Sequence, residues 1–194
     1  TNPKFQHIGQ YRDIETLNHY SLLQAEGKSE EEVLAILQEK SRDNSRTPVQ
    51  WNSKRNAGFT KGTPWISVAD NYSRINAENA LKDPKSIFYH YQKLIQLRKN
   101  YDIITNGEYR LYDEQHPQLF VYERVLEDER LLVINNFYEQ TTKLHLPIEL
   151  LNDYSHEHLL SNTIQTPRLS ADMEIGPYDS YIFLLKKNES MANH

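Results

Sequence analysis

The sequence contains no cysteine, no excess of positive charge and no long apolar run. Without cysteine, its 194 residues can form neither a disulfide framework nor a thiolate metal site. The 22 Lys and Arg residues do not exceed the 27 Asp and Glu residues, which disfavours a nucleic-acid-binding surface. Nearly apolar runs such as residues 181–185 are far too short to span a bilayer. We therefore expect a soluble globular protein without a nucleic-acid or membrane partner.

Two short amphipathic helices are predicted near the start of the chain. Apolar residues recur at helical spacing after Asp13, which suits an N-cap, and the pattern stops at Gly27, which suits the left-handed position after a helix. Ser29 opens a second helix, and Glu32 follows three residues later at the spacing of a capping box. The apolar face of this second helix comprises Val33, Leu34, Ile36 and Leu37.

The segment after these helices, residues 41–71, shows neither a helical nor a strand period. So long a stretch without regular structure is usually a functional loop or a linker. A linker would be poor in large aromatic residues, yet this segment contains Trp51, Phe59 and Trp65. Because burial of such rings removes a large area from water, we expect an ordered loop whose aromatic residues pack against other parts of the protein.

A further helix and a series of short strands are predicted from residue 83 onward. Asp83 and Pro84 suit an N-cap and a first helical turn, and apolar residues continue at helical spacing to Leu97. After Asn100 the pattern changes to short strands separated by turn residues, which is typical of an antiparallel sandwich. The candidate strands are residues 108–112, 119–125, 130–136, 143–146, 158–161 and 180–185.

No motif in the sequence supplies a metal site, a cofactor site or an activated nucleophile. The closest histidines, His156 and His158, share a predicted strand, but no motif places a carboxylate beside them. The chain has no Gly-rich phosphate loop, and its loop serines lack a nucleophile elbow. The acidic residues 30–32 are explained by the helix dipole, because they lie in a first helical turn. The residues themselves therefore indicate no catalytic group, no metal and no cofactor.

The polar residues of the 41–71 loop leave two interpretations open. Arginine, aspartate and amide side chains beside tryptophan suit a sugar, because planar polar groups can hold vicinal hydroxyls while aromatic rings cover C–H patches. The alternative is a salt-bridge network of Arg42, Asp43 and Arg46 that only holds the loop in place. The residues concerned are Arg42, Asp43, Arg46, Gln50, Asn52 and Asn56.

The same loop carries a family resemblance. The strings SRDNSRTPVQW and NAGFTKGTPWI resemble a signature of the α-amylase family of glycoside hydrolases, and further matches are QYRDIETLN, SIFYHYQKLIQLRKN and LLVINNF. The resemblance covers almost the whole chain to Lys187. It is to the branch that contains oligo-1,6-glucosidase, dextran glucosidase and trehalose-6-phosphate hydrolase, and the form KSRDNSRTPVQW is most similar to the last of these. Val49 and Asn52 depart from the residues common in the branch.

The resemblance implies a (β/α)₈ barrel followed by a small antiparallel β-domain, with the active site at the carboxyl ends of the barrel strands. In this chain the implied fold class is α+β. Residues 1–100 would be the C-terminal end of the barrel, 101–187 the antiparallel β-sandwich and 188–194 a tail. The family's aspartate nucleophile, glutamate acid/base and second aspartate would all lie upstream of Thr1. The chain by itself is therefore expected to hold no catalytic residue and to be inactive.

The implied parent is a cytoplasmic retaining α-glucosidase that hydrolyses trehalose 6-phosphate to glucose and glucose 6-phosphate, with an oligo-1,6-glucosidase or dextran glucosidase as the alternative. Arg46 matches the arginine of the family's R-T-P-x-Q-W motif, which helps to hold the non-reducing glucose. Asp43 either orients Arg46 or only braces the loop. Trp51 and Trp65 are expected to be packing residues.

A different class remains open, a non-catalytic carbohydrate-binding or interaction module in which the β-sandwich does the work. Against it, the aromatic residues concentrate in the 41–71 loop, and no exposed aromatic platform is expected on the strands. The helical segments also need a barrel to cover their apolar faces. If the chain exists alone, we expect it to associate through these exposed helices. The expected ligand of the parent is a small sugar.

Overall fold

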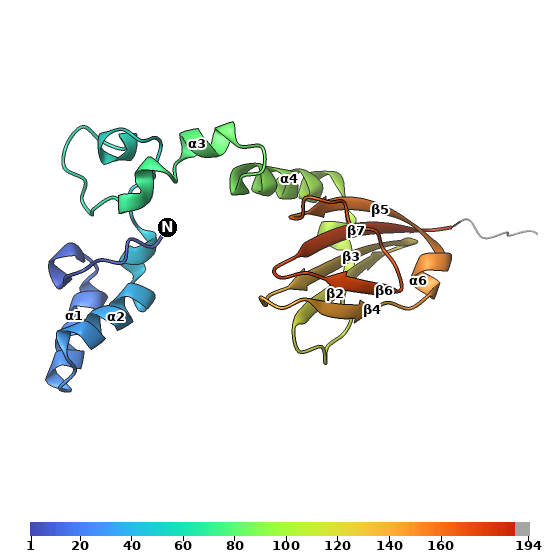
Figure 1. The fold of residues 1–194 in the computed structure, drawn as a ribbon, viewed down its shortest axis with the longest axis horizontal. Coiled ribbons are helices and arrows are strands. Elements are labelled where there is room, and N and C mark those ends of the chain that lie inside the picture. Colours follow the sequence, from blue (N-terminus) through green and yellow to red (C-terminus); the bar gives the residue numbers. More distant parts are fainter. Residues whose placement is uncertain (189–194) are drawn as a thin grey trace, which may run out of the picture. The chain divides into compact units, whose positions relative to one another are not determined.

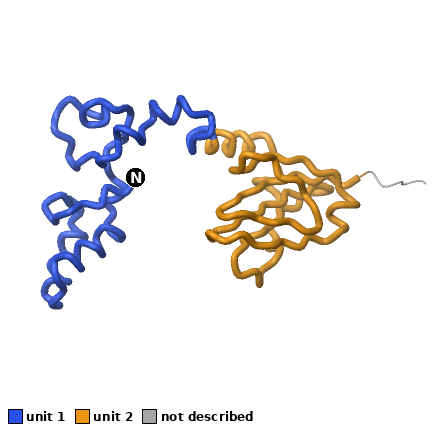
Figure 2. The backbone as a smooth tube through the Cα atoms, in the orientation of Figure 1, with its two compact units in different colours: residues 1–89 blue, residues 90–194 orange. Residues whose placement is uncertain are grey.

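The computed structural model describes residues 1–188, and the chain divides into two compact units at Tyr89–His90 (Figure 2). Within the described residues, the first unit is helical and the second contains the strands (Figure 1). The division falls inside helix α4, eleven residues before the predicted domain boundary at 100/101. Beyond Asn188, the predicted tail lies outside the described residues.

The first unit is a series of short helices joined by irregular segments. Its elements in chain order are η1 (Ile8–Gln10), α1 (Ile14–Ala25), α2 (Glu30–Lys40), η2 (Arg42–Ser45), η3 (Arg55–Gly58), η4 (Asp70–Ser73), α3 (Ala77–Lys82) and the start of α4 (Ile87–Asn100). The two tandem helices predicted at the start of the chain are confirmed as α1 and α2. Helix α3 and the four 3₁₀ turns were not predicted.

Local capping determines where α1 and α2 begin and end. The Asp13 side chain accepts a hydrogen bond from the Thr16 N–H, and the Ser29 side chain accepts one from Glu32. Gly27 has a φ of +88° and donates to the Gln24 carbonyl, while the next residue donates to the Leu23 carbonyl. This is a Schellman ending, so the prediction for Gly27 is confirmed.

The first unit has a small core. It is a cluster of buried residues from the N-terminal segment, α1, α2 and the following loop, and one aromatic pair in it, Phe5 and Tyr11, meets edge to face with centroids 5.1 Å apart. The members are Phe5, Tyr11, Leu23, Val33, Leu37 and Ile66. This core holds the start of α1 beside the end of α2.

The start of α4 differs from the prediction. Asp83 and Pro84 do not open the helix, which begins at Ile87. Instead, the Asp83 carbonyl and carboxylate accept the N–H groups of Ser86 and Lys85, at 3.0 and 2.9 Å. The aspartate caps a turn rather than the helix itself. No α4 residue is buried, and Ile87 and Tyr91 are 83% and 63% exposed.

The second unit is built on two antiparallel sheets. The larger sheet has the strand order β1-β2-β3-β7-β5, and the smaller pairs β4 with β6. Of its two short helices, α5 precedes β1 in the chain and α6 lies between β4 and β5. The bounds are α5 (Ile103–Asn106), β1 (Glu108–Leu111), β2 (Leu119–Leu126), β3 (Glu129–Asn136), β4 (Thr142–His145), α6 (Glu149–Asn152), β5 (Tyr154–Ser161), β6 (Asp172–Ile175) and β7 (Ser180–Lys187).

The main core of the second unit joins the two sheets. Alternate residues such as Ile134 on β3 and Phe183 on β7 pack with Leu144 and Ile175 of the smaller sheet. On the opposite face of β3, Leu131 and Val133 pack with Leu184 and with Ile103 of α5. Strand β3 is therefore buried on both faces along its central apolar run, Leu131–Ile134. Of these strands, only the four-residue β6 was not predicted.

Candidate functional site

The site is built where the start of α1 meets the end of α2. Asp13 is the N-cap of α1, and its Oδ2 accepts hydrogen bonds from the Thr16 N–H at 3.1 Å and the Thr16 hydroxyl at 2.9 Å. The Thr16 hydroxyl is also 2.8 Å from the Ser41 Oγ, which follows the last residue of α2. A buried pair of hydroxyls thus links the two helices at this point.

Asp43, one of the two predicted site residues, is fully buried in the turn η2. Its Oδ2 accepts the backbone N–H groups of Arg12 and Asp13, at 2.6 and 2.8 Å. Its own N–H donates to Ser41 Oγ at 3.2 Å. The Asp43 carboxylate therefore holds the backbone at the start of α1, and only its main-chain carbonyl contacts Arg46, through the Arg46 N–H at 3.1 Å.

Arg46, the other predicted site residue, ends the same turn. Its Nη1 lies 3.4 Å from Asp13 Oδ1, and its side chain is 45% exposed. Arg42 shares the same carboxylate oxygen at 3.4 Å and also pairs with Glu15. The structure thus brings Arg42 and Arg46 together on Asp13, so the two arginines form a salt-bridge network, but Asp13 and not Asp43 is its acid.

The charges around Asp13 keep it ionised. Partial burial acts to raise the pKa of Asp13, but the Thr16 hydrogen bonds and the charges of Arg42 and Arg46 outweigh it and lower the pKa. Nearby, burial and the Asp43 carboxylate raise the pKa of Tyr11 to about 12. At neutral pH the Asp13 carboxylate therefore faces two guanidinium groups, and the half-exposed Arg46 keeps N–H donors that make no hydrogen bond within residues 1–188. Such donors suit sugar hydroxyls or a carboxylate.

The amide side chains of the loop bind backbone rather than joining the arginines. Gln50 donates to the Ile75 carbonyl, and Asn56 donates to the carbonyls of Thr60 and Gly62, at 3.2 and 2.7 Å. Asn52 accepts the N–H of Lys54 at 3.0 Å. The 41–71 loop is ordered, as predicted, and these amides hold its turns.

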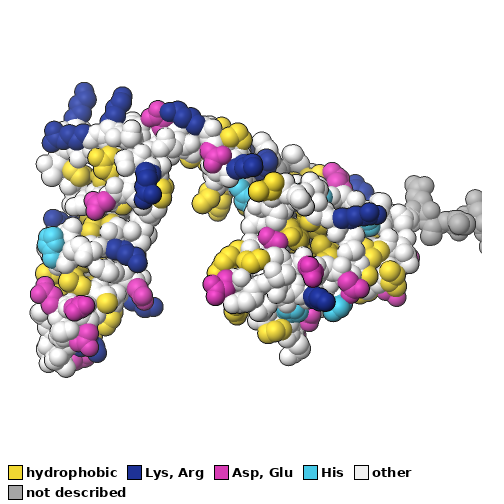
Figure 3. All heavy atoms as spheres, in the orientation of Figure 1, with side chains coloured by type: hydrophobic (Ala, Val, Ile, Leu, Met, Phe, Trp, Pro, Cys, Tyr) yellow, Lys and Arg dark blue, Asp and Glu magenta, His cyan; other side chains and the backbone are white. Residues whose placement is uncertain are grey.

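The tryptophans of the loop are not packed in the described chain. Trp51 and Trp65 are each 54% exposed, and Phe59 is 44% exposed. The expectation that these rings pack is therefore wrong within this structure. The loop is ordered by hydrogen bonds instead, such as Trp51 N–H to the Ala57 carbonyl at 2.9 Å. Hydrophobic side chains at the surface are visible on both units (Figure 3).

A cavity of about 630 Å³ lies beside the Asp13 network. Asp13 and Arg42 line it, whereas Arg46 does not. Its other lining residues are Glu15, Thr16, His19, Leu37, Lys40 and Ser41. Within residues 1–188, no group of three or more acidic or histidine side chains is arranged to hold a metal ion.

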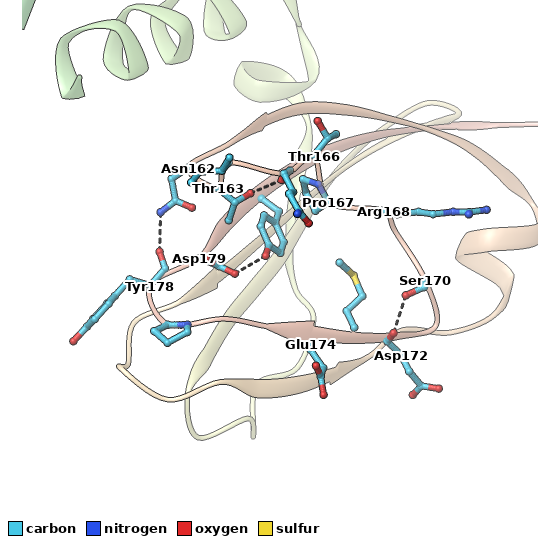
Figure 4. A pocket seen from close by; sticks show the side chains of 15 residues that line it. Asn162, Thr163, Thr166, Pro167, Arg168, Ser170, Asp172, Glu174, Tyr178 and Asp179 are labelled. Carbon is cyan, nitrogen blue, oxygen red and sulfur yellow. Dashed lines mark hydrogen bonds between the residues drawn. The ribbon is translucent and has the colours of Figure 1, made fainter. Parts of the chain in front are cut away.

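A larger cavity, of about 830 Å³, lies in the second unit beneath the segment between β5 and β6 (Figure 4). Several polar groups that line it form hydrogen bonds with one another. Asn162 donates to the Tyr178 carbonyl at 2.8 Å, and Asp179 accepts hydrogen bonds from Gly176 N–H and the Tyr181 hydroxyl. Burial, aided by Asp179, raises the pKa of Tyr181. These contacts engage part of the polar lining internally, whereas Arg168 and Glu174 also line the cavity.

An aromatic row that was not expected runs along β1 and β2 and continues at Phe137, just after β3, with Tyr122 in it only partly exposed. Ring centroids of Tyr109 and Tyr122, and of Tyr122 and Phe120, are 5.4 Å apart, and Phe137 continues the row at 6.4 Å from Phe120. Tyr109 and Phe120 are 49% and 40% exposed. The antiparallel register puts residues 109, 120 and 122 on one face of the sheet. The expectation of no aromatic platform on the strands is therefore wrong.

Comparison with family models identifies the chain. Residues 6–107, more than half of its length, match the model of the alpha amylase catalytic domain. The chain belongs to the alpha-amylase family. The matched segment includes Asp13, Asp43 and Arg46. A second model, the alpha-amylase SusG C-terminal domain, matches residues 119–182, which run from β2 into β7.

Relatives within the alpha-amylase family include two hydrolase types. A trehalose-6-phosphate hydrolase of Bacillus subtilis (strain 168) is 51% identical, over 96% of this chain and 33% of the relative. An oligo-1,6-glucosidase of Halalkalibacterium halodurans is 44% identical, over 97% of this chain and 34% of the relative. The chain therefore spans about a third of the length of these relatives.

A solved structure agrees with the family assignment. The crystal structure of Bacillus licheniformis trehalose-6-phosphate hydrolase superposes with a TM-score of 0.91 at 53% identity, over 96% of this chain and 34% of that one. The predicted α-amylase resemblance and the α+β fold class are thus confirmed. No helix among residues 1–188 is both long enough and apolar enough to cross a membrane.

Asp13 is the site residue that the sequence did not reveal. Its position before an apolar period indicated only an N-cap, because capping depends on local spacing. Its pairing with Arg46 joins residues 33 positions apart, and no sequence pattern links them. The sequence offered only the polar residues of the 41–46 motif, and the acid among them is Asp43.

Proposed function

We propose that the chain is the C-terminal portion of a retaining α-glucosidase that hydrolyses trehalose 6-phosphate to glucose and glucose 6-phosphate. The observation that carries this proposal is the 51% identity, over nearly the whole chain, to a relative named trehalose-6-phosphate hydrolase. A second relative of that name, from Escherichia coli (strain K12), is 52% identical over 70% of the chain. The oligo-1,6-glucosidase of Halalkalibacterium halodurans is less similar, at 44%.

In the proposed reaction, a carboxylate attacks the anomeric carbon, a carboxylic acid protonates the departing oxygen, and water then releases the glucosyl-enzyme. We place these acids in the part of the parent that this chain does not cover. Arg46 contributes from this chain by donating to the non-reducing glucose. Asp43 supports the site indirectly, because its buried carboxylate binds the backbone that precedes α1.

The remaining predictions for the parent are unchanged by the structure. We propose a cytoplasmic location and association of the isolated chain through its exposed helices. The face of α4 that carries Ile87, Phe88, Tyr91 and Ile95 supports the latter, because each of these side chains is at least 46% exposed. In a larger catalytic domain, such a face would be covered.

A substrate comparison tests the proposed activity. The full-length polypeptide that contains this chain is assayed with trehalose 6-phosphate, trehalose, isomaltose and a short dextran oligomer. We expect trehalose 6-phosphate to be hydrolysed with a kcat/KM about tenfold or more above that of the others, since a site built around a charged group rejects analogues that lack it. Preference for isomaltose or dextran would make the parent an oligo-1,6-glucosidase or dextran glucosidase instead.

A non-catalytic carbohydrate-binding module is the second candidate, and the aromatic row of Tyr109, Tyr122, Phe120 and Phe137 favours it. Aromatic rings at these separations offer apolar faces to a chain of sugars. Binding of soluble starch or dextran by the 194-residue chain, measured by calorimetry, would support this candidate. Hydrolysis of trehalose 6-phosphate by the full-length polypeptide, with no binding by the chain alone, would exclude it.

A further inference from the structure

The two oxygens of the Asp13 carboxylate have separate tasks. Oδ2 accepts both hydrogen bonds from Thr16 and caps α1. Oδ1 faces the guanidinium groups of Arg46 and Arg42, each at 3.4 Å. The Asp13 side chain is only 7% exposed, whereas that of Arg46 is 45% exposed. Asp13 is therefore the fixed partner in this pair. Its contact can orient the side chain of Arg46.

The position of Asp13 is itself determined by buried polar contacts. Its backbone N–H donates to Asp43 Oδ2 at 2.8 Å, and Asp43 in turn is held by Ser41. Ser41 closes the ring through the Thr16 hydroxyl, at 2.8 Å. Because Thr16, Ser41 and Asp43 are buried, loss of one of their contacts would leave an unsatisfied polar group, which is costly. The ring therefore holds the Asp13 carboxylate rigidly.

We propose that Asp13 is the positioning residue for Arg46, holding its guanidinium so that the remaining N–H donors face the glucose unit of the substrate. This inference rests on the proposed function, in which Arg46 contacts that glucose. An arginine side chain has many rotamers, and ordering it on the substrate alone would cost conformational entropy. A carboxylate already anchored beside it removes part of that cost before the substrate binds.

Two features of the network support this role for Asp13. The Thr16 hydrogen bonds and the two arginines lower the pKa of Asp13 despite its partial burial, so its negative charge is present at neutral pH. Arg42, which contacts the same oxygen, has a second partner in Glu15. Both arginines contact Asp13 Oδ1 at the same time, each at 3.4 Å, so the Arg46 contact does not depend on Glu15. Loss of Glu15 should disturb Arg42 and leave the Asp13–Arg46 contact in place.

A double-mutant cycle in the full-length polypeptide tests the inference. The variants are Asp13→Asn, Arg46→Ala and their combination, with Glu15→Gln as the matched control. Asparagine can still accept the Thr16 hydrogen bonds and cap α1, since it is as good an N-cap as aspartate. The readouts are kcat and KM for trehalose 6-phosphate, together with the thermal unfolding midpoint of each variant.

We expect Asp13→Asn to lower kcat/KM about fivefold in the wild-type background and by less than about twofold when Arg46 is already alanine, because the two residues act as one unit. Glu15→Gln should retain wild-type kinetics. The thermal midpoint of Asp13→Asn should remain close to that of the wild type. This non-additive result is one that a general loss of folding would not produce.

Three results would overturn the inference, and they can be distinguished. If Asp13→Asn lowers kcat/KM by the same factor in both backgrounds, or has no effect while Arg46→Ala is strongly impaired, Asp13 does not act through Arg46. In either case the proposed role of Arg46 stands. If Arg46→Ala itself has wild-type kinetics, Arg46 does not contact the substrate, and both the inference and that part of the proposed function fail.

Discussion

At the scale of single residues, Asp43 and Arg46 differ in burial and in what their side chains contact. Asp43 has no exposed surface, and its carboxylate binds two N–H groups about 30 positions earlier in the chain. Arg46 is three residues away from Asp43, yet nearly half of its side chain is accessible. The two residues that the family signature places together therefore have different physical roles.

Replacement of Arg46 by alanine is expected to reduce turnover by the full-length polypeptide about tenfold or more, since loss of a charged hydrogen bond in the transition state costs ~2 kcal/mol. The measurement is steady-state hydrolysis of trehalose 6-phosphate. Arg46→Lys is the control that keeps the charge but loses the planar set of donors, and it should retain only part of the activity. Wild-type turnover in the alanine variant would show that Arg46 only holds the loop in place and does not contact the substrate.

The sequence indicated part of this candidate site. The motif around residues 42–46 located Arg46 and Asp43, because their neighbours in the chain form a recognisable string. It did not identify the acid that holds Arg46, because that acid, Asp13, is separated from it by a whole helical hairpin. It also grouped the loop amides with the arginines, whereas Gln50 and Asn56 bind backbone carbonyls.

At the scale of elements, local capping explains which boundaries were predicted correctly. Helix α2 begins with a complete capping box, in which the Glu32 N–H donates to Ser29 Oγ at 3.3 Å and the Ser29 N–H donates to Glu32 Oε2 at 2.9 Å. Such boxes are defined by residues three apart, so sequence suffices. The prediction failed at α4, where Asp83 uses its oxygens to cap a turn before the helix.

Removal of the Ser29 cap is expected to destabilise the first unit. Ser29→Ala should lower its free energy of unfolding by about 1 kcal/mol, because the Glu32 N–H loses its acceptor. Ser29→Asn, which can still cap, is the control and should stay close to the wild type. The measurement is urea unfolding of the 194-residue chain followed by tryptophan emission, since both tryptophans lie in this unit. Equal unfolding curves for alanine and wild type would contradict the expectation.

The same box gives the first unit a pH dependence. Hydrogen bonds from the Ser29 N–H and hydroxyl lower the pKa of Glu32 against a smaller effect of burial, with help from Lys28. The folded pKa thus lies below the unfolded value of about 4.3. The stabilisation is complete above that unfolded value and is lost as the pH falls through the folded pKa. Glu32→Gln, which does not titrate, should therefore weaken the acid dependence of the same urea transition.

At the scale of the whole molecule, the two units differ in how much core each possesses. The first unit has one cluster of six buried apolar residues. The second has a cluster of thirteen between its sheets and a further four on the outer face of the larger sheet. Because burial of apolar surface is the main favourable contribution to folding, the second unit should be the more stable when the chain is alone.

Unfolding of the 194-residue chain is therefore expected to give two transitions. Tryptophan emission reports only the first unit, which contains both Trp51 and Trp65. We expect it to change at a lower temperature than the one at which the amides of β3 lose their protection from hydrogen exchange. Leu37→Ala in α2 should destabilise only the first unit, and Leu132→Ala in β3 only the second. Each should lower the free energy of unfolding of its unit by about 2–5 kcal/mol. Coincidence of the two probes would mean that the chain unfolds as one cooperative body.

The sequence by itself determined the family, the caps of α1 and α2 and most strands, because each depends on residues that are neighbours in the chain or a few positions apart. Tertiary structure decided the rest. It placed Asp13 against Arg46, turned the Asp43 carboxylate toward the backbone of Arg12 and Asp13, and left Trp51 and Trp65 exposed. The physical reason is distance along the chain: a charge pair or a packed ring depends on where intervening turns bring the backbone, and no local spacing records that position.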